Sequence, residues 1–69
     1  MKPKTPGRYW VTDPNLTIID GNNRHLACYE FDLRRRGRGF TVHMVGIAGY
    51  PDVSLSAVRD DLIWEPVSK

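Results

Sequence analysis

The sequence predicts a mainly β fold: a small antiparallel sheet of four to five strands with one short helical turn near residues 54–61. Apolar and polar residues alternate over 25–33, glycines and asparagines separate the apolar stretches, and 69 residues suffice for one small domain. We therefore expect a single β domain over residues 8–69 and a flexible lead-in over residues 1–7. With 41% hydrophobic and 26% charged residues, the composition is that of a globular domain rather than a disordered tail.

The first third of the chain predicts two short strands followed by a tight turn. Residues 8–12 are aromatic and β-branched, which favours a strand, and the Asp-Pro-Asn sequence at 13–15 is expected to end it. Residues 16–19 predict the second strand. Residues 20–23 read Asp-Gly-Asn-Asn and predict a turn, because glycine and asparagine tolerate positive φ angles.

Residues 25–47 predict a long β-hairpin. Alternate positions of its first strand are apolar, which indicates one buried and one solvated face. These apolar positions are Ala27, Tyr29, Phe31 and Leu33. The second strand, 40–47, repeats the pattern with Phe40, Val42 and Met44. Between the strands, residues 35–39 hold three arginines and two glycines, so we expect a polar turn there.

The last part of the chain predicts a helical turn and a final edge strand. Three apolar residues are spaced as on one side of a helix, namely Leu55, Val58 and Leu62. Ser54 or Asp52 is the candidate N-cap of this turn. Residues 62–67 predict a strand, and Pro66 places it at a sheet edge because proline cannot donate a hydrogen bond to a strand ladder.

A short helical turn before the last strand favours an SH3-like, partly open barrel as the architecture. An OB-like barrel is disfavoured because its usual chain is longer, and a sheet covered by one packed helix stays open as an alternative. A domain of this size buries only about 60% of its unfolded surface. A homodimer that completes the sheet is therefore a further candidate arrangement.

A run of arginines is the strongest candidate for a binding site. The chain carries a net charge of +2, and its middle section is basic. Guanidinium groups fork onto phosphates and stack on bases, and an aromatic residue beside a basic tip is a feature of single-strand binders. We therefore expect a small non-enzymatic binding module that contacts nucleic acid or a nucleoprotein through Arg24, Arg34, Arg35, Arg36, Arg38 and Phe40. A solvated polar turn without a binding role is the alternative.

The acidic residues near the end of the chain offer a second functional hypothesis. Acidic side chains on a rigid domain can engage a basic groove of another protein. The protein would then be a phage-type inhibitor or adaptor that docks on a host protein complex, for example a defence or transcription complex, and blocks its ligand site. The acidic partner surface would consist of Asp52, Asp60, Asp61 and Glu65. Alternatively, these acidic residues cap a helical turn or lie on a solvated face and bind no partner.

The sequence predicts no catalytic, metal or cofactor site. His25 and Cys28 are three positions apart, so they point to opposite faces of a strand, and even with His43 the set is one ligand short of a structural zinc site. A chain of this size also struggles to hold a water-excluded active site. The single cysteine excludes an internal disulfide, which favours a reducing cytoplasm. No apolar run reaches the roughly 18 residues of a membrane span.

Overall fold

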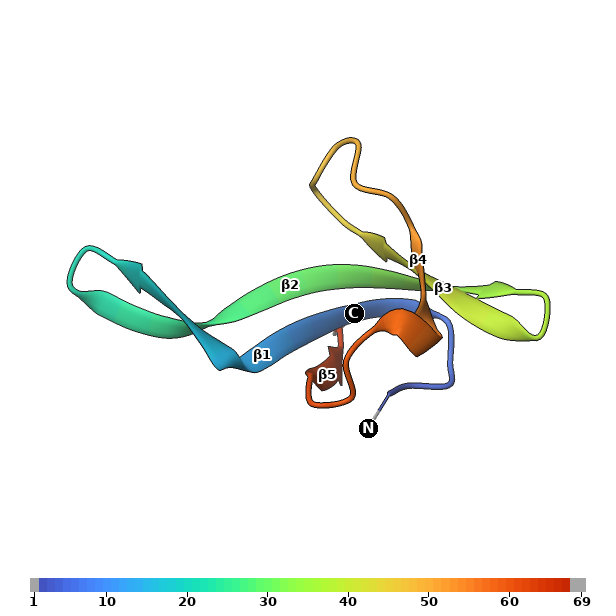
Figure 1. The fold of residues 1–69 in the computed structure, drawn as a ribbon, viewed down its shortest axis with the longest axis horizontal. Coiled ribbons are helices and arrows are strands. Elements are labelled where there is room, and N and C mark those ends of the chain that lie inside the picture. Colours follow the sequence, from blue (N-terminus) through green and yellow to red (C-terminus); the bar gives the residue numbers. More distant parts are fainter. Residues whose placement is uncertain (1, 68–69) are drawn as a thin grey trace.

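Five strands form one open antiparallel sheet in the computed structural model, which describes residues 2–67 (Figure 1). Across the sheet the strand order is β4-β3-β2-β1-β5. The bounds are Gly7–Asp20 for β1, Asn23–Arg36 for β2, Gly39–Met44 for β3, Val53–Ser54 for β4 and Ile63–Pro66 for β5. A 3-10 turn, η1 at Leu55–Ala57, lies between β4 and β5. The predicted mainly β fold with a short helical turn is confirmed. Predictions that fall on residues 1, 68 and 69 lie outside the described residues.

The sheet has two open edges, formed by β4 and β5. Within residues 2–67, β4 pairs with β3 and β5 pairs with β1, but the two edge strands do not pair with each other. The helical turn lies before the last strand, as expected, but it is only three residues long. Ser54 is the N-cap residue of this turn, as predicted, but its side chain makes no capping hydrogen bond. Asp52 instead contacts His43.

β1 is one continuous strand where the sequence predicts two. Its register with β2 shifts between Asp13 and Thr17, so residues 14–16 have no partner there. The strand therefore bulges at the Asp-Pro-Asn sequence instead of ending. A bulge accommodates Pro14, which has no backbone N–H to donate. Asp13 stabilises the bulge because its Oδ1 accepts a hydrogen bond from the Asn15 N–H at 2.9 Å.

The core lies on one face of the sheet, as the alternation in β2 predicts. Three strands contribute its buried cluster, which is Tyr9, Val11, Phe31, Leu33 and Val42. The residues with helical spacing also pack against this cluster, namely Leu55, Val58 and Leu62. Trp64 joins them, with its ring centroid 5.8 Å from that of Tyr9 and 5.7 Å from that of Phe31. Trp10 is 45% exposed on the opposite face, so the two tryptophans do not pack together.

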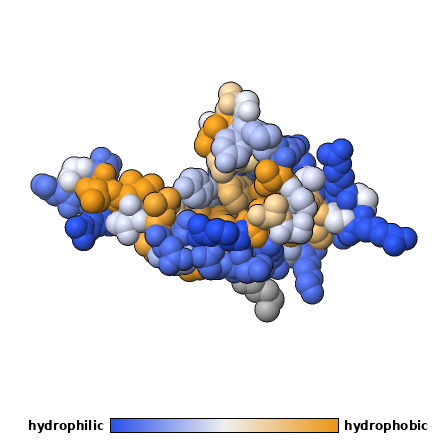
Figure 2. Space-filling view, viewed as in Figure 1, coloured by the Kyte–Doolittle hydropathy of each residue, from blue (hydrophilic) through white to orange (hydrophobic). Residues whose placement is uncertain are grey.

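The β1–β2 hairpin extends beyond the other strands as a two-stranded ribbon, the hairpin arm, residues 13–27 (Figure 1). The molecule is accordingly elongated, at 45 × 27 × 27 Å. The arm ends in the predicted turn, where Gly21 has a φ of 62°. It carries exposed apolar side chains (Figure 2): Leu16, Ile18, Ile19 and Leu26. In residues 2–67 there is no helix long and apolar enough to cross a membrane.

Candidate nucleic-acid interface

Four arginines gather at the end of the β2–β3 hairpin, which we call the arginine end: Arg34, Arg35, Arg36 and Arg38. The sequence predicts a turn over 35–39, but β2 continues through Arg36, which pairs with Gly39. The turn itself is only Gly37 and Arg38. Gly37 has a φ of 59°, which side chains rarely adopt and which permits so tight a turn. Figure 2 shows hydrophilic side chains protruding at this end of the molecule.

Alternation along β2 sends successive arginines to opposite faces of the sheet. Arg35 shares the core face with Leu33, and its guanidinium carbon lies 5.0 Å from the centre of the Phe40 ring, a cation–π contact. Arg34 lies on the other face, where its Nε donates a hydrogen bond to Asp32 Oδ2 at 2.9 Å. One guanidinium is therefore stacked on an aromatic ring and another is partly neutralised.

Arg36 and Arg38 differ from Arg34 and Arg35 because, among residues 2–67, neither an acidic side chain nor an aromatic ring is found against their guanidinium groups. Both residues are exposed, and neither forms an ion pair with another residue in the range 2–67. Their backbone is held by the β2–β3 ladder and the tight turn, so the two charges are presented on an ordered element. Free guanidinium groups on such an element suit the binding of phosphate oxygens.

Phe40 is the aromatic residue of the arginine end. It is half-buried, packs against the core and pairs across the hairpin with Arg35. Tyr29, the other aromatic candidate, pairs with Val11 and stacks on Phe31 with 6.1 Å between ring centroids. Tyr29 therefore belongs to the core, and a base could stack at the arginine end only against Phe40 or a guanidinium plane.

Arg24 does not lie with the other arginines. It pairs with Ile19 near the tip of the hairpin arm. At about 3.3 Å per residue, the ten positions from Arg24 to Arg34 along β2 span roughly 33 Å. The expectation that Arg24 adjoins the basic tip is therefore corrected, because β2 is one extended strand that carries the two residues toward opposite ends of the molecule.

Two of the four acidic candidates form ion pairs with a lysine or an arginine, and a third is hydrogen-bonded to a histidine, which is charged only when protonated. Asp52 contacts a histidine, Asp60 a lysine and Asp61 an arginine; the partners are His43 at 2.8 Å, Lys2 at 3.2 Å and Arg59 at 2.9 Å. Glu65 on β5 forms no ion pair among the residues that the structure describes. The acidic surface thus presents less free charge to a partner than its composition indicates.

Arg59 joins the β1 bulge to the segment before β5. Its Nη2 donates to Asp13 Oδ1 at 2.7 Å, and its Nε donates to Asp61 Oδ1 at 2.9 Å. These hydrogen bonds hold the pKa of both carboxyl groups below the ordinary value, because they favour the ionised form. The Asn15 side-chain amide donates a further hydrogen bond to Asp61. The network therefore ties the bulge to the last part of the chain.

Replacing Arg59 by glutamine should destabilise the fold at neutral pH and much less in acid. The two carboxyl groups have a lowered pKa in the folded state, so their contribution is fully present above the unfolded pKa of about 4. It is lost as the pH falls through the folded pKa. The difference in unfolding free energy between wild type and Arg59→Gln should therefore shrink below about pH 4. Urea unfolding at several pH values measures it, and a constant difference would contradict the role of Arg59.

The histidines and the cysteine are dispersed over the sheet. Cys28 is exposed, and His25 lies in the hairpin arm. His43 lies on β3, where it contacts Asp52, the residue before β4. Among the described residues no group of three or more His, Cys, Asp or Glu side chains is placed to hold a metal ion. These residues therefore add no candidate site to the arginine end.

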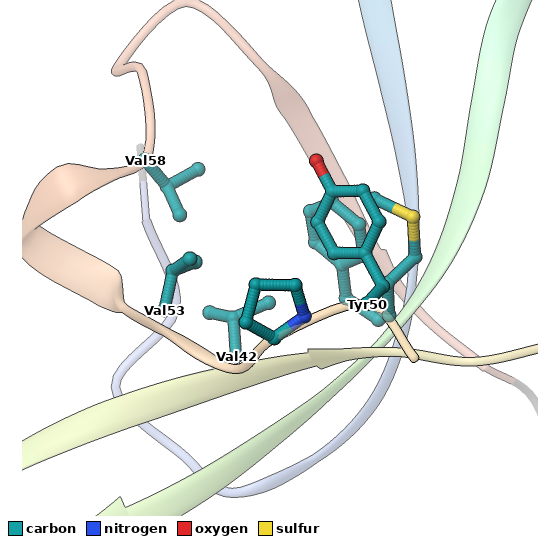
Figure 3. A pocket seen from close by; sticks show the side chains of 7 residues that line it. Val42, Tyr50, Val53 and Val58 are labelled. Carbon is teal, nitrogen blue, oxygen red and sulfur yellow. The ribbon is translucent and has the colours of Figure 1, made fainter. Parts of the chain in front are cut away.

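Pockets beside β3 extend the candidate interface. One of about 320 Å³ adjoins the arginine end and is lined by Lys2, Gly39, Phe40, Ser54, Leu55 and Ser56. Another of about 140 Å³ lies on the core face, where Figure 3 shows Val42, Tyr50, Val53 and Val58 around it. Among residues 2–67 no charged side chain lines the smaller pocket, so these residues offer no group there that would orient a charged ligand. The larger pocket includes Phe40, the residue on which the Arg35 guanidinium stacks.

Sequence reasoning missed Lys2, Ser54 and Ser56, because residues so far apart in the chain meet only through the fold. It also missed the exposed apolar arm, although a signal was present. Ile18 and Ile19 are adjacent, so they must face opposite sides of a strand, and a two-stranded ribbon cannot bury both. Comparisons with protein-family models, with curated proteins and with solved structures find no match for this chain, so its own residues and geometry carry the functional argument.

Proposed function

We propose that this protein is a small non-enzymatic module that binds nucleic acid, or a nucleoprotein, through the arginine end. The observation that carries the proposal is the free charge of Arg36 and Arg38 on an ordered, exposed turn. Two of the four acidic candidates, in contrast, already form ion pairs with a lysine or an arginine of the chain. Charge that no intramolecular partner compensates is available to an anionic ligand.

Binding of this kind is governed by phosphate contacts. Arginine forks onto phosphate oxygens in two parallel hydrogen bonds, which positions the nucleic acid without reading its sequence. A two-residue turn flanked by strands presents the guanidinium groups at one end of the molecule, where a phosphate backbone can approach without meeting the rest of the sheet. The proposed setting is the reducing cytoplasm, where Cys28 stays a free thiol.

A salt titration of binding tests the proposed function. The probe is a fluorescently labelled 20-nucleotide oligonucleotide of mixed sequence, single-stranded or annealed to its complement, and the signal is fluorescence anisotropy. With four phosphate contacts, the affinity for the duplex should fall by about two orders of magnitude between 50 and 200 mM salt. Absence of binding at 50 mM salt would refute the proposal.

A second candidate function is the docking of the hairpin arm on a host protein, as in a phage-type inhibitor or adaptor. The observation that favours it is the open strand edge of the arm. The Val45 N–H donates to the Glu30 carbonyl at 3.0 Å, so even-numbered residues of β2 direct their backbone groups away from β1. Within residues 2–67 no strand covers those groups in this part of β2, where they belong to Arg24, Leu26 and Cys28. Exposed edges of this kind accept an added strand from a partner protein.

Placing lysines on the arm should abolish protein docking and leave nucleic-acid binding intact. The variant Ile19→Lys with Leu26→Lys charges two side chains that are 65% and 42% exposed, so the fold itself should tolerate it. The measurement is affinity capture from a nuclease-treated host lysate. This function is supported if a protein is retained by the wild type and by the double variant Arg36→Ala with Arg38→Ala, but is not retained by the lysine variant. Equal retention by the lysine variant would exclude the arm.

A further inference from the structure

The larger pocket is built from segments that meet at the arginine end. Gly39 and Phe40 form one side, and these residues pair with Arg36 and Arg35 across the hairpin. Ser54, Leu55 and Ser56 of β4 and η1, together with Lys2, complete the lining. The volume of about 320 Å³ lies in the range of sites that hold small organic ligands. The pocket is therefore large enough for part of a nucleotide, and the Arg35 guanidinium lies against its Phe40 wall.

Its lining combines a flat apolar surface with hydroxyl groups. Leu55 and Phe40, whose ring also carries the Arg35 guanidinium, supply the apolar part. The hydroxyl oxygens of Ser54 and Ser56 lie 2.9 Å apart, and only one of the two hydroxyl hydrogens is used in that contact. The other hydroxyl hydrogen is left to donate to a ligand. A ligand that offers both an apolar ring face and an acceptor oxygen fits this set of groups.

Lys2 places a cation at the same pocket. Its side chain is only 19% exposed, and its Nζ lies 3.2 Å from Asp60 Oδ1. The Asp60 side chain is 92% exposed, so it can turn into solvent when a stronger anion approaches. Arg35 shares the core face with Phe40 and lies over its ring, so a second cation lies beside the pocket. That charge distribution complements a phosphate diester on either side of one nucleotide.

We propose that this pocket receives an unpaired base of single-stranded nucleic acid, stacked against Phe40, while the neighbouring phosphates contact Lys2, the serine hydroxyls and the arginines. The inference rests on the proposed function and specifies single-stranded nucleic acid as the preferred ligand. In a duplex both faces of a base are covered by neighbouring bases, so only the phosphates can reach the arginine end. A single strand offers the phosphates and a free ring face together.

The test compares a single-stranded 20-mer with its duplex, as DNA and as RNA, because the ring face and the phosphates are common to both. Replacing Phe40 by leucine should lower single-strand affinity roughly tenfold, since aromatic stacking is lost, and should leave duplex affinity unchanged. Phe40 also packs on the core, so thermal unfolding of the variant is measured in parallel. Ser56→Ala with Lys2→Met, which leaves the buried cluster untouched, should lower single-strand affinity several-fold.

The outcomes separate this inference from the proposed function. Selective loss of single-strand binding in both variants, with the folded state retained, supports the pocket. Two results would contradict base binding in the pocket: equal affinity of the wild type for single strand and duplex, or full single-strand binding by the Ser56→Ala with Lys2→Met variant. Neither result would contradict phosphate binding at the arginine end. No binding of either form by the wild type at 50 mM salt overturns both.

Discussion

Arg36→Ala with Arg38→Ala should bind a nucleic-acid duplex roughly 30-fold more weakly than the wild type at about 0.15 M salt. Each phosphate contact releases close to one condensed counterion, so removing two contacts lowers both the affinity and its dependence on salt. The plot of log affinity against log salt should become shallower by about two. Both residues are exposed and outside the core, so the variant should fold as the wild type does.

A matched control for this variant is available on the same strand. Arg24→Ala removes an arginine from the far end of β2, roughly 33 Å from Arg34. Because this charge is distant from the arginine end, its loss should leave the salt slope unchanged and should lower the affinity only slightly. The measurement is anisotropy of a labelled duplex at four or more salt concentrations. If Arg24→Ala and the double variant give the same slope, binding reflects net charge alone and the arginine end is not the interface.

Leu33→Ala should leave much of the protein unfolded. Leu33 is only 1% exposed and belongs to the buried cluster, so truncation removes buried methyl groups and leaves a cavity. Such substitutions lower the free energy of unfolding by about 2–5 kcal/mol. A domain below about 70–80 residues rarely has more than 3–5 kcal/mol to lose. The variant should therefore populate the unfolded state in water at room temperature.

Urea unfolding monitored by tryptophan fluorescence measures this loss, since Trp64 packs on the same cluster. The control is Leu26→Ala, a leucine of the same strand that is 42% exposed in the hairpin arm. Its effect should stay below about 1 kcal/mol, because little buried contact is lost. Similar losses in the two variants would mean that the core does not lie on the face of β2 that carries Leu33.

The features that the sequence could predict are local and periodic. The alternation from Ala27 to Leu33 identified the buried face of β2, because a strand has a side-chain period of two. The glycine at position 21 marked the turn that closes the first hairpin. Even the helical spacing of Leu55 and Val58 identified core contacts, although the helical turn itself is three residues long.

The features that could not be predicted depend on pairing between distant residues. A proline such as Pro14 is compatible both with the end of a strand and with a bulge inside one. The structure shows a bulge because β1 pairs with β2 both before and after Pro14. The position of Arg24 relative to Arg34 depends on how far β2 runs without a break. Lys2 reaches the candidate site because its side chain meets a loop nearly sixty residues later.

The hairpin arm gives the molecule two levels of local stability. Each arm strand has one hydrogen-bonded neighbour and exposed apolar side chains, whereas β1 and β2 are flanked on both sides in the centre of the sheet. An isolated two-stranded ribbon is marginally stable in water. We therefore expect the arm to open and close as a separate cooperative unit while the central strands stay folded. We thus expect the backbone amides of the arm to exchange with solvent more readily than those of the central strands.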